Sequence, residues 1–295
     1  MFGIVDDPLV IVGWQADPVL IGGLLTLAVL YGLAVGPLRE RLAPGTAFER
    51  GPALWFAAAV ATFYLVEGSP LHDLAERYLL SAHMLQHLLL SYVVARMFIV
   101  GVPTWLWRVL LLNRVMAPVS KVLLRPTTAF VVFSLFFGIW HVPVIYEGAL
   151  MNPFVHHVEH VVFLITAIML WWPIMSPLPE RPRAPHIVQM AYLFTIPIAQ
   201  LPVFAAITFS PDVVYRTYEI APRAYTWLSP LADQALAGAI MKVMGLAFFS
   251  VPFTRIFFDW YRRENRRAVT QRDMRRSGTE GVSLSGEGVV APPAP

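Results

Sequence analysis

The sequence has no cysteine and few charged residues: none of its 295 residues is Cys, and only 14% are Asp, Glu, Lys or Arg. Without cysteine there are no disulfides, thiolate metal sites, iron–sulfur clusters or thiol relays, so a soft metal ion must be bound by His or Met. Hydrophobic residues make up 57% of the chain, and soluble domains average about a quarter charged residues. The composition therefore predicts a membrane protein.

Seven apolar stretches are long enough to cross a hydrocarbon core of about 30 Å, which takes about 20 helical residues. We expect an all-α fold, with about seven transmembrane helices forming one domain over residues 1–261. The second stretch is the shortest. The predicted spans are residues 18–36, 51–66, 78–100, 127–147, 154–175, 187–210 and 231–258.

The distribution of basic residues predicts the orientation of these helices, because Lys and Arg are retained on the cytoplasmic side of a membrane. With the N-terminus outside, only Arg77, Arg216 and Arg223 fall in outer segments, and Lys242 falls within a span. The other 18 of the 22 basic residues fall on the cytoplasmic side. We therefore predict an outer N-terminus and a cytoplasmic C-terminus.

Two further segments lie on the predicted cytoplasmic side. Residues 104–125 are apolar but interrupted by basic residues, which indicates a helix lying on the membrane surface. Residues 262–295 are rich in Arg and then in Gly, Ser and Pro, so we expect a disordered tail. The net charge of +3 implies no nucleic-acid partner, since topology already explains the basic residues.

Six of the eight histidines fall near the same outer face of the membrane in this arrangement. They come from three separate segments, and two histidines four residues apart lie on one face of a helix, where both can reach one ion. Ionisable residues within spans are costly and mark functional sites. The pattern predicts a shared metal or cofactor site formed by His83, His87, His141, His156, His157 and His160.

Other residues near this face are candidates for binding the metal or orienting its ligands. A carboxylate can do either, and thioethers suit Cu(I). These candidates are Glu159, Asp233, Met241, Met244 and His72, the last of which we place in an outer loop. Lys242 lies near the predicted bilayer centre and is a separate functional candidate. The sequence does not indicate which residue pairs with it.

The residues alone leave several interpretations of this site open. Single intramembrane histidines also serve as interhelical hydrogen-bonding groups, and methionines on apolar helices usually pack. Heme is the rival cofactor, but paired histidines on one helix face suit a compact ion better. A zinc protease is disfavoured, since neither pair has the HExxH pattern.

Several motifs, in order, are similar to those of the CtaG family of bacterial cytochrome c oxidase assembly factors. The resemblance extends over roughly residues 15–260. It rests on residues 83–87 (His-Met-Leu-Gln-His), residues 140–143 (Trp-His-Val-Pro) with Tyr146, residues 157–160 (His-Val-Glu-His) leading into residues 171–173 (Trp-Trp-Pro), and Asp233-Gln234 followed by Ala237-Gly238.

The resemblance implies a non-enzymatic, multi-span protein of the bacterial plasma membrane that is needed to make active heme–copper oxidase. The family positions carried over are His83, His87, His141, His160 and Asp233, with either His156 or His157. The hypothesis is that these residues take copper from an extracytoplasmic donor and pass it to the oxidase catalytic subunit. A heme-binding redox protein, a copper permease and a metal-free assembly scaffold remain the alternatives.

Overall fold

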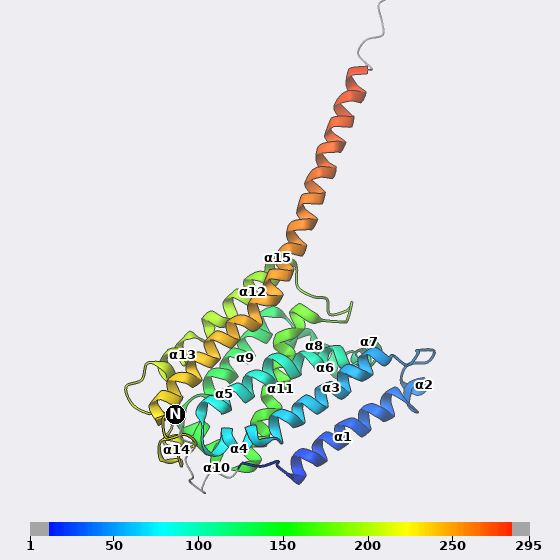
Figure 1. Cartoon of the computed structure of the whole chain (residues 1–295). Coiled ribbons are helices and arrows are strands. Elements are labelled where there is room, and N and C mark those ends of the chain that lie inside the picture. Colours follow the sequence, from blue (N-terminus) through cyan, green and yellow to red (C-terminus); the bar gives the residue numbers. More distant parts are fainter. Residues whose placement is uncertain (1–11, 285–295) are drawn as a thin grey trace, which may run out of the picture.

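The computed structural model describes residues 12–284, and this part of the chain is all-helical (Figure 1). The longer helices form a bundle, and short helices connect them at both ends. In chain order they are α1 (Pro18–Val35), α2 (Arg39–Leu42), α3 (Arg50–Glu67), α4 (Pro70–Arg77), α5 (Leu80–Leu89), η1 (Leu90–Val94), α6 (Ala95–Gly101), α7 (Thr104–Leu111), α8 (Met116–Leu123), α9 (Pro126–Trp140), α10 (Pro143–Met151), α11 (Pro153–Met175), α12 (His186–Ala199), α13 (Leu201–Thr208), α14 (Arg216–Ile220) and α15 (Pro230–Leu284).

The helices agree with the prediction of an all-α membrane protein. Within residues 12–284, five helical stretches are long and apolar enough to cross a membrane, and the number rises to seven if two bent helix pairs each count as one span. One bent pair is α3 with α4, at 44°, and the other is α8 with α9, at 79°. The exact number of spans and their orientation stay predictions.

The predicted third span is a composite of α5, η1 and α6. Its middle part, η1, is a π-helical turn, a feature that often occurs at functional sites. The carbonyl of Ser91 within this turn accepts a hydrogen bond of 2.9 Å from the indole N–H of Trp171 on α11. The π turn, which begins at Leu90 shortly after His87, is thereby fixed against α11.

The hydrophobic core lies between α5, α9, α11, α12 and α15. Its largest fully buried side chains include Trp171, Tyr92, Phe133 and Phe163. By contrast, α1 lies at the edge of the bundle beside α3 (Figure 1), and its one buried residue is Val35. The core thus holds α5 and α11 firmly, whereas α1 is a peripheral helix.

The structure describes both segments that we predicted on the cytoplasmic side, the second of them through Leu284. Residues 104–125 form two short helices, α7 and α8, and α7 buries Trp105, Leu106 and Trp107 against the bundle. The last helix, α15, continues through Leu284, and residues 261–271 are exposed; that residues 262–295 form a disordered tail stays a prediction. Arg, Glu, Gln and Ala in this stretch are good helix formers. Residues 285–295 lie outside the described residues.

Gly101 marks a close approach of two backbones, and its replacement provides a stability test. A Cβ atom at this position would lie 2.6 Å from the backbone nitrogen of Phe56 on α3. We expect Gly101→Ala to force α6 and α3 apart and to lower the free energy of unfolding by about 1–3 kcal/mol. Thermal unfolding in detergent measures this change. The control is Gly22→Ala, where a Cβ meets nothing within 4 Å; equal midpoints for the two variants would refute the close-packing argument.

Candidate metal centre

Two histidines of α5 face each other inside the bundle. His83 and His87 are one helical turn apart, and their Nε2 atoms are separated by 2.6 Å. Both residues are buried, and neither Nδ1 atom has a hydrogen-bond partner among the described residues. Since buried polar atoms normally have partners, these unpartnered nitrogens make the pair a candidate ligand site.

Two histidines of α11 complete the cluster. Asn152 caps the start of this helix by accepting hydrogen bonds from the backbone N–H groups of Phe154 and Val155. His156 and His160 follow on one face, with ring centroids 4.2 Å apart. The His160 ring lies 5.0 Å from that of His87. The two i, i+4 pairs that the sequence places on separate helices therefore meet.

Two carboxylates orient the α11 histidines. Glu67, at the end of α3, lies 2.6 Å from Nδ1 of His160, and Glu76, on α4, lies 2.5 Å from Nδ1 of His156. A carboxylate bound to one ring nitrogen fixes the ring and leaves the other nitrogen to face a metal. In both histidines that other atom, Nε2, is buried without a hydrogen-bond partner in the described chain.

The sequence analysis did not single out Glu67 or Glu76. The only signal available was the presence of two acidic residues at the outer end of an apolar span, where an unpaired charge is costly. Instead we named Glu159, which is also buried and lies 3.5 Å from Nε2 of His87 through its Oε1 atom. Glu159 therefore borders the α5 pair, while the other two carboxylates bind the α11 pair.

The ligand atoms form two groups, each within 4.8 Å. The first, here called the deep triad, is His83, His87 and His160, all buried. The second, here called the outer group, is His72, Glu76 and His156. Nitrogen ligands about 2 Å from one ion lie at most about 4 Å apart, so small side-chain movements bring either group onto a metal ion.

His72 is part of this cluster, although we predicted it in an outer loop. That placement is wrong, because Ser69 caps a helix by accepting a hydrogen bond from the N–H of Leu71, and Pro70 starts α4 there. The His72 ring stacks on His156 with centroids 5.8 Å apart. Its Nδ1 atom lies 2.9 Å from Nε2 of Gln86 on α5.

His141 lies beside the cluster but belongs to neither group. Its Nδ1 atom lies 2.6 Å from the carbonyl oxygen of Phe137, and its Nε2 atom is buried without a hydrogen-bond partner in the described chain. The side chain lines a cavity of about 20 Å³ together with His87, Met241 and Gln200. Met241 and His87 of the deep triad thus line the same cavity.

His157 is held away from the cluster. Its Nδ1 atom lies 2.6 Å from the carbonyl of Pro153, and its Nε2 atom lies 2.9 Å from Asp17. Burial alone raises the pKa of Asp17, but the N–H groups of Val19 and Leu20 and the nearby His157 bring it below its ordinary value. Of the two adjacent histidines, His156 is therefore the one placed among the other rings.

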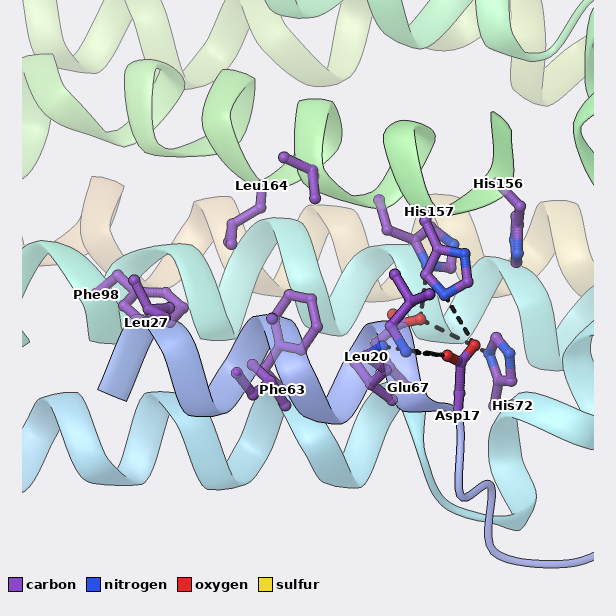
Figure 2. Close-up of a pocket in the computed structure, with 15 residues that line it drawn as sticks. Asp17, Leu20, Leu27, Phe63, Glu67, His72, Phe98, His156, His157 and Leu164 are labelled. Carbon is purple, nitrogen blue, oxygen red and sulfur yellow. Dashed lines mark hydrogen bonds and ion pairs between the residues drawn. The ribbon is translucent and has the colours of Figure 1, made fainter. Parts of the chain in front are cut away.

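A cavity of about 330 Å³ lies beside the cluster, between α1, α3 and α11 (Figure 2). One end is lined by polar side chains, among them Asp17, Glu67 and His72, and the other by apolar side chains such as Leu27 and Phe98. His156 and His160 line the same cavity. The histidine cluster consequently borders an apolar space beside the peripheral helix α1.

Asp233 caps α5 instead of reaching the cluster. Its carboxylate accepts a 2.7 Å hydrogen bond from the N–H of Leu80 and further bonds from Ser81. Because this carboxylate satisfies free N–H groups at a helix start, we expect Asp233→Ala to reduce the free energy of unfolding by about 0.5–2 kcal/mol. Denaturant titration in detergent tests this, with the exposed Asp212→Ala as control. A stability equal to that of the control would contradict the capping role.

The remaining candidates lie in the body of the bundle. Met244 packs against the hydrophobic core. The ammonium of Lys242 lies 5.9 Å from the ring centroid of Phe204. It also lines a small cavity with Gln200 and Met241. These contacts place Lys242 at the α13–α15 interface and not in the histidine cluster.

The comparison with family models identifies the chain. The model of the cytochrome c oxidase caa3 assembly factor, Caa3_CtaG, matches residues 29–263. The chain belongs to this family. No curated protein and no solved structure matches the sequence. The family match shows a multi-span oxidase assembly factor of the plasma membrane, and the cluster adds buried histidine groups able to hold a metal ion.

Proposed function

We propose that this assembly factor binds copper at the deep triad and delivers it to the catalytic subunit of cytochrome c oxidase. The observation that carries the proposal is the convergence of His83, His87 and His160, whose ligand atoms lie within 4.8 Å of one another in a buried site. Imidazole is a good ligand for copper, zinc, iron and nickel. Copper is the choice among these because the family assembles a copper-containing oxidase.

The role is non-enzymatic: copper is cargo that the protein takes up and gives away. Three imidazoles leave room for a further ligand, and transfer by ligand exchange needs such an open position. Burial keeps water from competing for the ion, while the cavity beside α1 brings apolar space close to His160. A partner within the membrane can therefore approach the site from the lipid side, and an extracytoplasmic donor can supply copper at the outer end.

Metal analysis of the purified protein tests this function. We expect protein in mild detergent, loaded with copper and desalted, to retain copper and to show no Soret band in the visible spectrum. A Soret band would favour a heme-binding redox protein. Protein that retains neither metal nor heme would refute copper binding and leave the metal-free scaffold as the better description. Zinc loading, carried out in parallel, measures the preference between the two ions.

A further inference from the structure

The outer group is a second cluster of metal ligands, distinct from the deep triad. Nε2 of His72 lies 3.0 Å from Oε1 of Glu76, and Nδ1 of His156 lies 2.5 Å from the same oxygen. We propose that His72, Glu76 and His156 form a second copper site, which receives Cu(II) from outside and passes it to the deep triad. This inference rests on the proposed function, since it requires the triad to accept copper.

The donor set of the outer group suits a divalent ion. Two imidazole nitrogens and one carboxylate oxygen match the N,O ligands that Cu(II) prefers. One carboxylate also compensates part of the charge of the ion. The protons now shared between Glu76 and the two rings leave when copper binds, because metal ligands must be deprotonated. The hydrogen-bonded cluster thus already places three ligand atoms around one point.

Exposure decreases from the outer group to the triad. The side chain of Glu76 is 29% exposed and that of His72 is 16% exposed, whereas His83 is fully buried. An ion arriving from outside therefore meets Glu76 and His72 before it reaches the triad. This gradient of exposure gives the order in which a copper ion would meet the ligands.

His156 connects the two sites. Its Nδ1 atom faces Glu76, and its Nε2 atom is buried without a hydrogen-bond partner in the described chain. The ring centroid lies 4.2 Å from that of His160 and 5.8 Å from that of His83. The His156 ring therefore has Nδ1 beside Glu76 and Nε2, which has no hydrogen-bond partner in the described chain, within the buried cluster.

The transfer is a ligand exchange without a change of oxidation state. The bonds from copper to Glu76, His72 and His156 break as bonds to His83, His87 and His160 form, so the ion keeps its charge. The His72 and His156 rings then take up again the protons that they share with Glu76. Gln86 and Glu67 lie alongside His72, at 2.9 Å and 3.7 Å from its Nδ1 atom, and hold that ring in place.

Copper titration of the full-length protein in detergent, followed by electron paramagnetic resonance, tests the outer site. We expect two Cu(II) ions per chain in the wild type and one in Glu76→Gln. The signal lost in this variant has nitrogen hyperfine structure from two imidazoles. His83→Gln combined with His87→Gln should lose the other ion and keep this signal. The matched control is Glu219→Gln, which changes an exposed carboxylate and should still bind two ions.

The outcomes separate this inference from the proposed function. If Glu76→Gln binds as much copper as the wild type, the outer site is refuted, while the deep triad stands. If the wild type binds no copper, the proposed function fails. If Glu76→Gln lowers the unfolding temperature but keeps both ions, the His72–Glu76–His156 contacts are structural, and the inference is again overturned.

Discussion

The double variant His83→Gln with His87→Gln is expected to lose the copper of the deep triad and to leave the cell without active cytochrome c oxidase. Changes to residues that merely orient metal ligands cost about 10–100-fold in affinity, and this variant removes two of the three ligands themselves. We therefore expect the affinity of the triad to fall by more than about 100-fold, which corresponds to more than about 2.7 kcal/mol. Glutamine keeps a polar side chain in the buried site, so the bundle should persist.

Three measurements on membranes from the same cells check this result: the amount of the protein, oxidase activity and copper content after purification. The control is His186→Gln, at the start of α12 and away from the cluster, which should behave as the wild type. Normal oxidase activity in the double variant would contradict copper delivery from the triad. Disappearance of the protein itself would instead assign the α5 pair a structural role.

Glu67→Gln is expected to weaken copper binding at the triad by about 10–100-fold without removing any ligand. Glu67 fixes His160 through a 2.6 Å contact to Nδ1, and the carboxylate also makes the imidazole a stronger donor. A glutamine amide keeps the size and a hydrogen bond but not the charge. Competition with a chelator of known copper affinity measures the change.

The matched control for Glu67→Gln is Glu49→Gln, an exposed acidic residue directly before the other end of α3. Its copper affinity should equal that of the wild type. If Glu67→Gln also binds copper with wild-type affinity, the carboxylate does not orient a ligand. A loss of stability without a loss of affinity would mean that the Glu67–His160 pair joins α3 to α11 and does no more.

The central part of the site could be predicted because it depends on helix periodicity. His83 and His87, like His156 and His160, are four residues apart, and this spacing puts each pair on one helix face. Threading seven apolar segments through a membrane then brought the pairs to the same depth. The helical class of the fold followed from composition and from the length of the apolar stretches.

Glu67, Glu76 and the helical position of His72 could not be predicted in the same way. Glu67 and Glu76 reach the histidine rings because the chain bends by 44° between α3 and α4. The local sequence does not predict the direction of such a bend, and therefore does not predict which helix these side chains contact. Asp233 is the opposite case. As an acidic residue at the right depth it resembled a candidate ligand, but the free N–H groups at the start of α5 take up its oxygens.

The peripheral position of α1 has a consequence for how fast the site can open. This helix lines the cavity beside His156 and His160, yet Val35 is its only buried residue, and near the site it is held by the 2.9 Å contact between Asp17 and His157. Half-exposed ion pairs contribute about 0–1 kcal/mol. Because α1 lies outside the core of α5, α9, α11, α12 and α15, a swing of this helix would leave that core intact. Under the proposed delivery, the barrier to releasing copper sideways would then be set by the contacts of α1, which include the hydrogen bond from Tyr31 to the carbonyl of Gly101, and not by the stability of the whole bundle.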